Sequence, residues 1–139
     1  MKDTDAIVQR FRDTGLKITP QRLSIFNLLK DNFDHPSAED IYHKALEIHP
    51  TISFTTVYKT LQTLRDLGEI LEINIDPERA HYDPITRDHY HTFCTRCREI
   101  EDLMPEFDPV QGLSDNNIAG GFDVQSVQVH LVGLCSGCN

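Results

Sequence analysis

The chain is 139 residues long and has a formal net charge of −9, with 13 Lys and Arg side chains against 22 Asp and Glu. Hydrophobic residues make up 39% of it, which is enough for one packed domain or two small ones. This composition excludes collagen, coiled coil and disordered chains, and no apolar run approaches the roughly 20 residues of a membrane span. The charged residues 1–13 lack the apolar core of a signal peptide, so we expect a cytoplasmic protein with no membrane partner.

Basic side chains gather locally despite the acidic total. Residues 1–30 hold six basic and three acidic groups, and residues 51–65 hold Lys59 and Arg65 with no acid. Residues 81–139 hold three basic and nine acidic groups. A local basic patch can bind phosphate on an acidic protein, because salt screens charges beyond about 8–10 Å. Charge by itself does not separate a nucleic-acid surface from a chance distribution.

Capping residues and apolar spacing predict four helices in the N-terminal half. They are expected over about residues 4–14, from Thr19-Pro20 to Leu29, from the Ser37 cap to His49-Pro50, and over residues 54–66 after the Ser53 cap. Gly15 and Gly68 are expected to end the first and the last of them. The sides expected to be buried are Ala6, Ile7, Val8 and Phe11; Leu23, Ile25, Phe26, Leu28 and Leu29; Ala38, Ile41 and Ala45; and Val57, Leu61 and Leu64.

The helix predicted over residues 54–66 has a polar outer face. That face shows Thr55, Thr56, Tyr58, Lys59 and Gln62, which can donate to phosphates or contact thymine methyls in a major groove. A strand over residues 70–75, a turn over 76–79 and a returning strand from residue 80 follow. Helices followed by a two-stranded hairpin outline a winged helix. The same pattern also fits a small helical domain whose polar face has no function.

Strand patterns dominate the C-terminal half. Strands are expected at Thr92-Phe93, at residues 100–103 and at residues 124–134, the last with Val127, Val129 and Leu131 on its buried face. A short helix is expected to begin at Asp108-Pro109, and a turn at Gly120-Gly121.

The four cysteines form two C-x-x-C pairs, Cys94 with Cys97 and Cys135 with Cys138. Residues 98–134 separate the pairs, which is longer than the roughly 15–20 residues of ordinary zinc ribbons. Four thiolates in a tetrahedron make a closed, structural Zn²⁺ site. Free thiols or a redox pair are the alternatives, and two matched pairs that use every cysteine favour zinc.

A second group of ligands combines histidine and aspartate. His89 and His91 are two residues apart, so a strand would place both imidazoles on one face. Asp83 precedes them, Asp102 follows the first cysteine pair, and His35 lies alone in the N-terminal half. Imidazole and carboxylate together suit Fe²⁺, Mn²⁺ or Zn²⁺ rather than Cu(I). As ligands, His81 and His130 are weaker candidates.

Taken together, these motifs resemble the ferric uptake regulator (Fur) superfamily of bacterial metal-dependent repressors, over nearly the whole chain. The segments that carry the resemblance are Lys17–Arg22, His35–Tyr42, Thr55–Leu61, His89–His91 and both cysteine pairs. The resemblance implies a homodimer with an α+β fold. It implies an N-terminal winged helix-turn-helix DNA-binding domain over residues 1–80, a hinge at about 76–84, and a C-terminal α/β metal-binding dimerisation domain over 81–139.

Within the superfamily the chain is most similar to the peroxide-sensing PerR branch. Asp102 supports this, because iron-sensing relatives generally have Glu there. The resemblance implies structural Zn²⁺ on the four cysteines and regulatory Fe²⁺ or Mn²⁺ on His35, Asp83, His89, His91 and Asp102. It is consistent with contacts to double-stranded operator DNA from Lys17, Arg22, Thr55, Thr56, Tyr58 and Lys59.

The resulting expectation is a metal-dependent repressor that leaves its operator when metal-catalysed oxidation modifies a ligand histidine. One alternative is an iron-, manganese- or zinc-responsive regulator that does not sense peroxide. Another is a metalloenzyme, which would need an open metal position and a substrate pocket. No nucleophile or general base beyond the ligands is evident in the sequence, so an enzyme is not expected.

Overall fold

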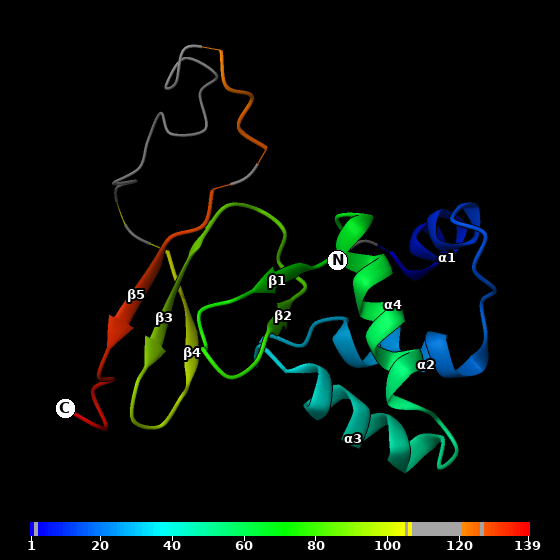
Figure 1. The fold of residues 1–139 in the computed structure, drawn as a ribbon, viewed down its shortest axis with the longest axis horizontal. Helices are drawn as coiled ribbons and strands as arrows, with labels where there is room; N and C mark the ends of the chain where they lie inside the picture. Colours follow the sequence, from blue (N-terminus) through cyan, green and yellow to red (C-terminus); the bar gives the residue numbers. More distant parts are fainter. Residues whose placement is uncertain (2, 105, 107–120, 126) are drawn as a thin grey trace. The chain divides into compact units, whose positions relative to one another are not determined.

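The computed structural model describes residues 1, 3–104, 106, 121–125 and 127–139. They form two compact units, Met1–Thr86 and Arg87–Asn139, here called the first unit and the second unit. Among the described residues, the first unit holds four helices and a hairpin, and the second holds a three-stranded sheet (Figure 1). The predicted α+β class is confirmed. No helix in these ranges has the length and apolar character needed to cross a bilayer.

Side-chain caps fix where three helices of the first unit begin. Thr19, Ser37 and Ser53 each accept a hydrogen bond on the side-chain oxygen from the backbone N–H three residues later. The chain leaves α1 and α4 through Gly15 and Gly68, whose φ angles of 84° and 70° favour glycine. The observed helices are α1 (Thr4–Asp13), α2 (Pro20–Leu29), α3 (Ala38–Ile48) and α4 (Phe54–Asp66), as predicted.

The core of the first unit lies between the apolar faces of these helices. Phe11 of α1 meets Phe26 of α2 edge to face, with ring centroids 5.3 Å apart. The predicted faces are buried in α3 and α4, but Ala6 of α1 is exposed. Ile7 and Phe11, four residues apart, define the buried stripe of α1, and Ala6 falls outside it. Val8, Leu23 and Leu28 are half-buried at the margin of the core.

A short antiparallel hairpin follows the helices. It pairs β1 (Leu71–Ile73) with β2 (His81–Asp83), with Ile73 opposite His81 and Leu71 opposite Asp83. The strand predicted over residues 70–75 is therefore wrong in extent, because the ladder ends at Ile73. Beyond it the chain enters the turn at Asp76, whose carboxylate accepts the Glu78 N–H at 2.9 Å.

The second unit is a sheet with strand order β4-β3-β5. Its strands are β3 (Tyr90–Cys94), β4 (Ile100–Leu103) and β5 (His130–Gly133). β3 pairs antiparallel with β4 and parallel with β5, so the central strand carries both kinds of ladder.

The long strand predicted over residues 124–134 is wrong in extent. Among the described residues of this range, the ladder with β3 comprises His130–Gly133, because β3 itself is five residues long. Leu131, expected on the buried face, is 49% exposed. The helix expected from Asp108 lies outside the described residues, as does Gly120 of the expected turn.

Candidate metal sites and nucleic-acid interface

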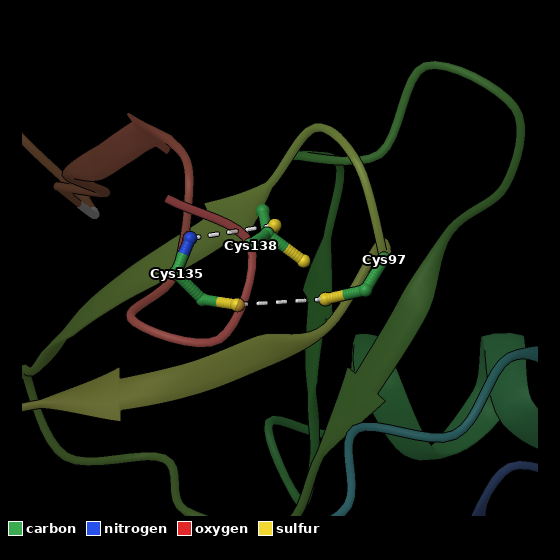
Figure 2. A group of neighbouring side chains, drawn as sticks. Cys97, Cys135 and Cys138 are labelled. Atoms are coloured by element: carbon green, nitrogen blue, oxygen red, sulfur yellow. Dashed lines mark hydrogen bonds between the residues drawn. The ribbon is translucent and has the colours of Figure 1, made fainter.

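Parallel pairing brings the two cysteine pairs to one edge of the second unit. β3 ends at Cys94, which lies opposite Gly133 in β5, and Cys135 follows two residues later. Parallel strands end at the same edge of a sheet, so the two C-x-x-C turns face each other (Figure 2). The Sγ atoms of the four cysteines all lie within 4.8 Å of one another.

The spacing of these sulfur atoms suits a tetrahedral zinc ion. All four cysteines are free, and the Cys97 and Cys135 Sγ atoms are 3.8 Å apart (Figure 2). A tetrahedron with Zn–S bonds of about 2.3 Å has an edge of about 3.8 Å. The four-sulfur donor set therefore fits Zn²⁺, and it leaves no position open for a substrate.

Backbone donors already favour a thiolate at one of these ligands. The N–H of Cys135 donates to the Sγ of Cys94 at 3.4 Å, and this bond, with others from the Cys97 and Arg96 N–H groups, lowers the pKa of Cys94 to about 6. Side-chain hydrogen bonding with Cys135, together with burial, raises the pKa of Cys138 to about 12. Four crowded thiols without a cation cannot all ionise together, whereas a divalent cation removes that conflict.

Two of the predicted regulatory ligands meet within the first unit. The Nε2 atom of His35 lies 3.4 Å from the Oδ2 atom of Asp83, and both side chains are almost fully buried. Asp83 ends β2, and His35 precedes the Ser37 cap of α3. A buried imidazole beside a buried carboxylate is an arrangement that favours a cation.

The other three predicted ligands meet within the second unit. His91 of β3 lies directly opposite Asp102 of β4 in the antiparallel ladder, and His89 precedes β3. The Oδ1 atom of Asp102 is 3.1 Å from His89 Nε2 and 3.4 Å from His91 Nε2. The two imidazole centroids are 4.4 Å apart. The five ligands therefore form two preformed sets of the same chemistry, one in each unit.

The two weaker histidine candidates have different surroundings. Both ring nitrogens of His81 are taken, one by the backbone oxygen of His35 and the other by the carboxylate of Asp76. The ring of His130 lies 6.0 Å from that of His91, and burial, followed by the nearby His91, lowers the pKa of His130. The sequence could not place His130 there, because this proximity depends on the parallel pairing of β5 with β3.

The exposed face of α4 carries three of the six predicted DNA contacts. Val57 and Leu61 are fully buried, whereas Thr55, Tyr58 and Lys59 are exposed. Thr56 is half-buried, and its hydroxyl lies 2.9 Å from that of Ser53, outside the main exposed face.

The two predicted contacts near α2 differ from each other. Lys17 is exposed. The Arg22 guanidinium donates to the Lys17 backbone oxygen and lies over the Phe11 ring at 5.7 Å. Arg22 therefore already has a structural role, in holding the start of α2 against α1.

Sequence reasoning missed Phe54 on the exposed side of α4. Its ring stacks on Tyr58 with centroids 6.2 Å apart and meets Tyr42 of α3 edge to face at 5.5 Å. Phe54 is 40% exposed and Tyr58 43%. The spacing of Phe54 and Tyr58 by four residues on a helix was the available signal.

Comparison with known proteins decides the family. The sequence pattern of the ferric uptake regulator family matches residues 13–132. The chain belongs to this family. It is 36% identical over 134 residues to the peroxide operon regulator of Bacillus subtilis, which covers 95% of this chain and 90% of that protein. It is 32% identical over 132 residues to the peroxide-responsive repressor PerR of Staphylococcus epidermidis, covering 94% and 87%.

Solved structures of the ferric uptake regulator family share the fold. The ferric uptake regulator Fur of Helicobacter pylori, reported with three functional metal binding sites, aligns over 99% of this chain and 94% of its own with a TM-score of 0.78 and 22% identity. The Campylobacter jejuni peroxide stress regulator aligns over 99% and 100% with a TM-score of 0.69 and 29% identity. These relatives are named as regulators rather than enzymes.

Proposed function

We propose that this protein is a metal-dependent transcriptional repressor that responds to peroxide. The observation that carries the proposal is the pair of preformed ligand sets, His35 with Asp83 in the first unit and His89, His91 and Asp102 in the second. Imidazole and carboxylate suit Fe²⁺ and Mn²⁺, and the relatives named as peroxide regulators match almost the whole chain.

The two ligand sets explain how a metal could control DNA binding. The side chains of both sets would hold Fe²⁺ or Mn²⁺ and so join the unit that carries α4 to the unit that carries the cysteine site. Bound Fe²⁺ would also supply redox chemistry with peroxide. The ligands select one arrangement of the two units from an ensemble, which is a metal-linked population shift. Transfer of one oxygen atom from hydrogen peroxide to the imidazole of His35 or His89, with release of water, would weaken that ring's bonding to the ion, and the link would be lost.

The second unit supports the proposed homodimer. Its edge strand β5 exposes apolar side chains, with Leu131 49% and Val132 61% exposed, and the following Leu134 49%. An exposed apolar edge strand pairs readily with another chain. The four cysteines, with Zn²⁺, would tie the end of β3 to the chain that leaves β5, so we assign zinc a structural role. The dimer presents two copies of α4 to successive major grooves of operator DNA, in the cytoplasm.

The α4 surface gives the proposed DNA contacts distinct tasks. Tyr58, backed by Phe54, offers an aromatic edge to a thymine methyl, and Thr55 offers a hydroxyl to a base or phosphate. Lys59 and Lys17 are exposed cations for the phosphate backbone. Arg22 affects DNA binding chiefly indirectly, because its guanidinium holds the start of α2 in place.

The test is metal-dependent DNA binding by a histidine variant and a matched control. His35→Ala removes a ligand from the first unit, and His43→Ala removes an exposed histidine from α3. We expect Mn²⁺ to raise the operator affinity of the wild type and of His43→Ala but not of His35→Ala. Equal responses of all three proteins would exclude the proposed switch.

Peroxide sensing is tested separately from metal sensing. The Fe²⁺-loaded protein is treated with dilute peroxide and its peptides are weighed, with the Mn²⁺-loaded protein as control. A gain of one oxygen on a peptide with His35 or His89, in the Fe²⁺ form alone, supports the peroxide response. Metal-dependent DNA binding without such a gain supports the alternative of a metal-responsive regulator that does not sense peroxide.

A further inference from the structure

The segment that carries His35 is bonded along the free edge of β2. The Tyr82 N–H donates to the Pro36 backbone oxygen at 2.9 Å, and the backbones of Ser37 and His81 form an isolated antiparallel β-bridge. β1 occupies the other edge of β2. Residues 35–37 therefore act as a third, very short strand of the hairpin.

One strand contacts both the backbone and the ring of His35. His81 and Asp83 are two residues apart in β2, so their side chains leave the strand on the same side. The His81 Nδ1 atom lies 2.6 Å from the His35 backbone oxygen, and the Asp83 carboxylate lies 3.4 Å from the His35 ring. Tyr82, between them, is 1% exposed and belongs to the helical core.

The backbone of His35 needs such support. Its φ angle is 51°, in the left-handed region that residues with a Cβ atom rarely adopt. Such a conformation persists where neighbouring groups impose it. A carbonyl oxygen can only accept a hydrogen bond, so Nδ1 of His81 must carry the proton. The hydrogen bond that results fixes the peptide plane that follows His35.

The second ring nitrogen of His81 reaches the hairpin turn. Its Nε2 atom lies 3.1 Å from Oδ2 of Asp76, and Oδ1 of Asp76 accepts the Glu78 N–H. His81 is buried, with 9% of its surface exposed. The imidazole thus spans from the turn at Asp76 to the backbone of His35, and neither nitrogen is available as a metal ligand.

We propose that His81 is a positioning residue for the regulatory metal site. Its Nδ1–H bond fixes the backbone from which the His35 ring reaches the ion, and its Nε2 atom ties that backbone to Asp76 in the hairpin turn. This inference rests on the proposed function, since it takes His35 as a ligand.

Two variants separate the roles of the two nitrogens. In His81→Asn the amide NH₂ lies near the position of Nδ1 and can still donate to His35, whereas in His81→Gln it lies near Nε2 and can reach only Asp76. We expect His81→Asn to bind Mn²⁺ within about twofold of the wild type. We expect His81→Gln to bind it about fivefold more weakly, the effect of one lost hydrogen bond.

Mn²⁺ affinity is measured by electron paramagnetic resonance titration of the full-length, zinc-loaded protein, with zinc content and circular dichroism as controls of folding. A general loss of structure would weaken both variants alike. Equal affinities of His81→Asn and His81→Gln, whether normal or reduced, would overturn the assignment to Nδ1.

A parallel titration distinguishes this inference from the proposed function. If His35→Ala binds Mn²⁺ as the wild type does, the regulatory site itself is wrongly assigned. If His35→Ala binds weakly while the two His81 variants bind equally, only the positioning role fails.

A measurement on the wild type does not depend on how any variant folds. In protein labelled with ¹⁵N-histidine, the assigned His81 Nδ1 atom should show a directly bonded, slowly exchanging proton before metal is added. A His81 ring whose Nδ1 carries no proton would overturn the proposal.

Discussion

Replacing Lys59 with alanine removes one positive charge from the exposed side of α4 and leaves the packed side of that helix unchanged. Lys59 is exposed, whereas Val57 and Leu61, two residues away on either side, are 0% exposed. Exposed substitutions of this kind change the free energy of unfolding by no more than about 0.5 kcal/mol. A loss of DNA binding by Lys59→Ala therefore reports a lost contact rather than a lost fold.

The size of the effect follows from the number of phosphates contacted. With one contact from each protomer of a homodimer, the variant loses two, and the slope of log K against log salt becomes shallower by about 1.8. Between about 50 and about 200 mM monovalent salt, a fourfold change, this slope difference changes the ratio of wild-type to variant DNA affinity by a factor of about 12. The affinity advantage of the wild type over Lys59→Ala should shrink by that factor across the range.

The assay is fluorescence anisotropy with a duplex selected from random sequence by the Mn²⁺-loaded wild type. Lys44→Ala is the matched control, because Lys44 is an exposed lysine on α3 outside the proposed interface. It should keep the wild-type slope. An unchanged slope in Lys59→Ala, or an equal loss in Lys44→Ala, would refute the phosphate contact.

Four further changes test the fold and the metal chemistry. Leu61→Ala should lower the free energy of unfolding by about 2–5 kcal/mol in urea titrations, since Leu61 is fully buried, and a loss below about 1 kcal/mol would contradict that packing. Cys97→Ser should lose zinc in native mass spectrometry and dissociate to monomers, whereas a folded, zinc-free dimer would exclude a structural site. Ser37→Ala should cost about 1 kcal/mol of stability through the lost cap of α3, and an unchanged unfolding midpoint would show that the cap contributes nothing. Burial opposes ionisation of Asp40, yet the hydrogen bonds with Ser37 lower the pKa of Asp40 below its usual 3.8. The contribution of the Asp40 carboxylate to stability should therefore be full above pH 3.8 and be lost as the pH falls through the lowered pKa. The difference in free energy of unfolding between the wild type and Asp40→Ala should accordingly narrow in acid.

The helices could be predicted because their signals are local. Thr19, Ser37 and Ser53 bond to N–H groups three residues away, and Gly68 supplies a left-handed residue where α4 ends. Such interactions depend on neighbours in the sequence, so the positions of caps and stops can be read without the tertiary structure.

The strands of the second unit could not be predicted to the same extent. The alternating pattern before Cys135 indicates a strand, but its paired length is set by β3, which lies far away in the sequence. The parallel direction of β5 is likewise a tertiary property, and with it come the exposure of Leu131 and the position of His130 beside His91.

The candidate ligands divide in a similar way. The cysteine pairs and the His89–His91 spacing are visible in the sequence, because ligand type and short spacing carry that signal. The engagement of both His81 nitrogens is not visible, because it depends on the chain folding back from Asp76 to His35. Arg22 similarly has the right charge for DNA, but its partners in the fold are already within the first unit.

The parallel pairing of β3 with β5 also has a consequence for the order of folding. His91 pairs with His130 across 39 residues of sequence (130 minus 91), whereas the hairpin of the first unit joins Ile73 to His81. Contacts between distant residues form slowly, and the N-terminal part of a chain leaves the ribosome first. The first unit should therefore be structured while the second is still being made. His35 and Asp83 are then in place before the metal ligands of the second unit have come together. A newly made chain then acquires metal control of its DNA-binding unit only as its last step of maturation.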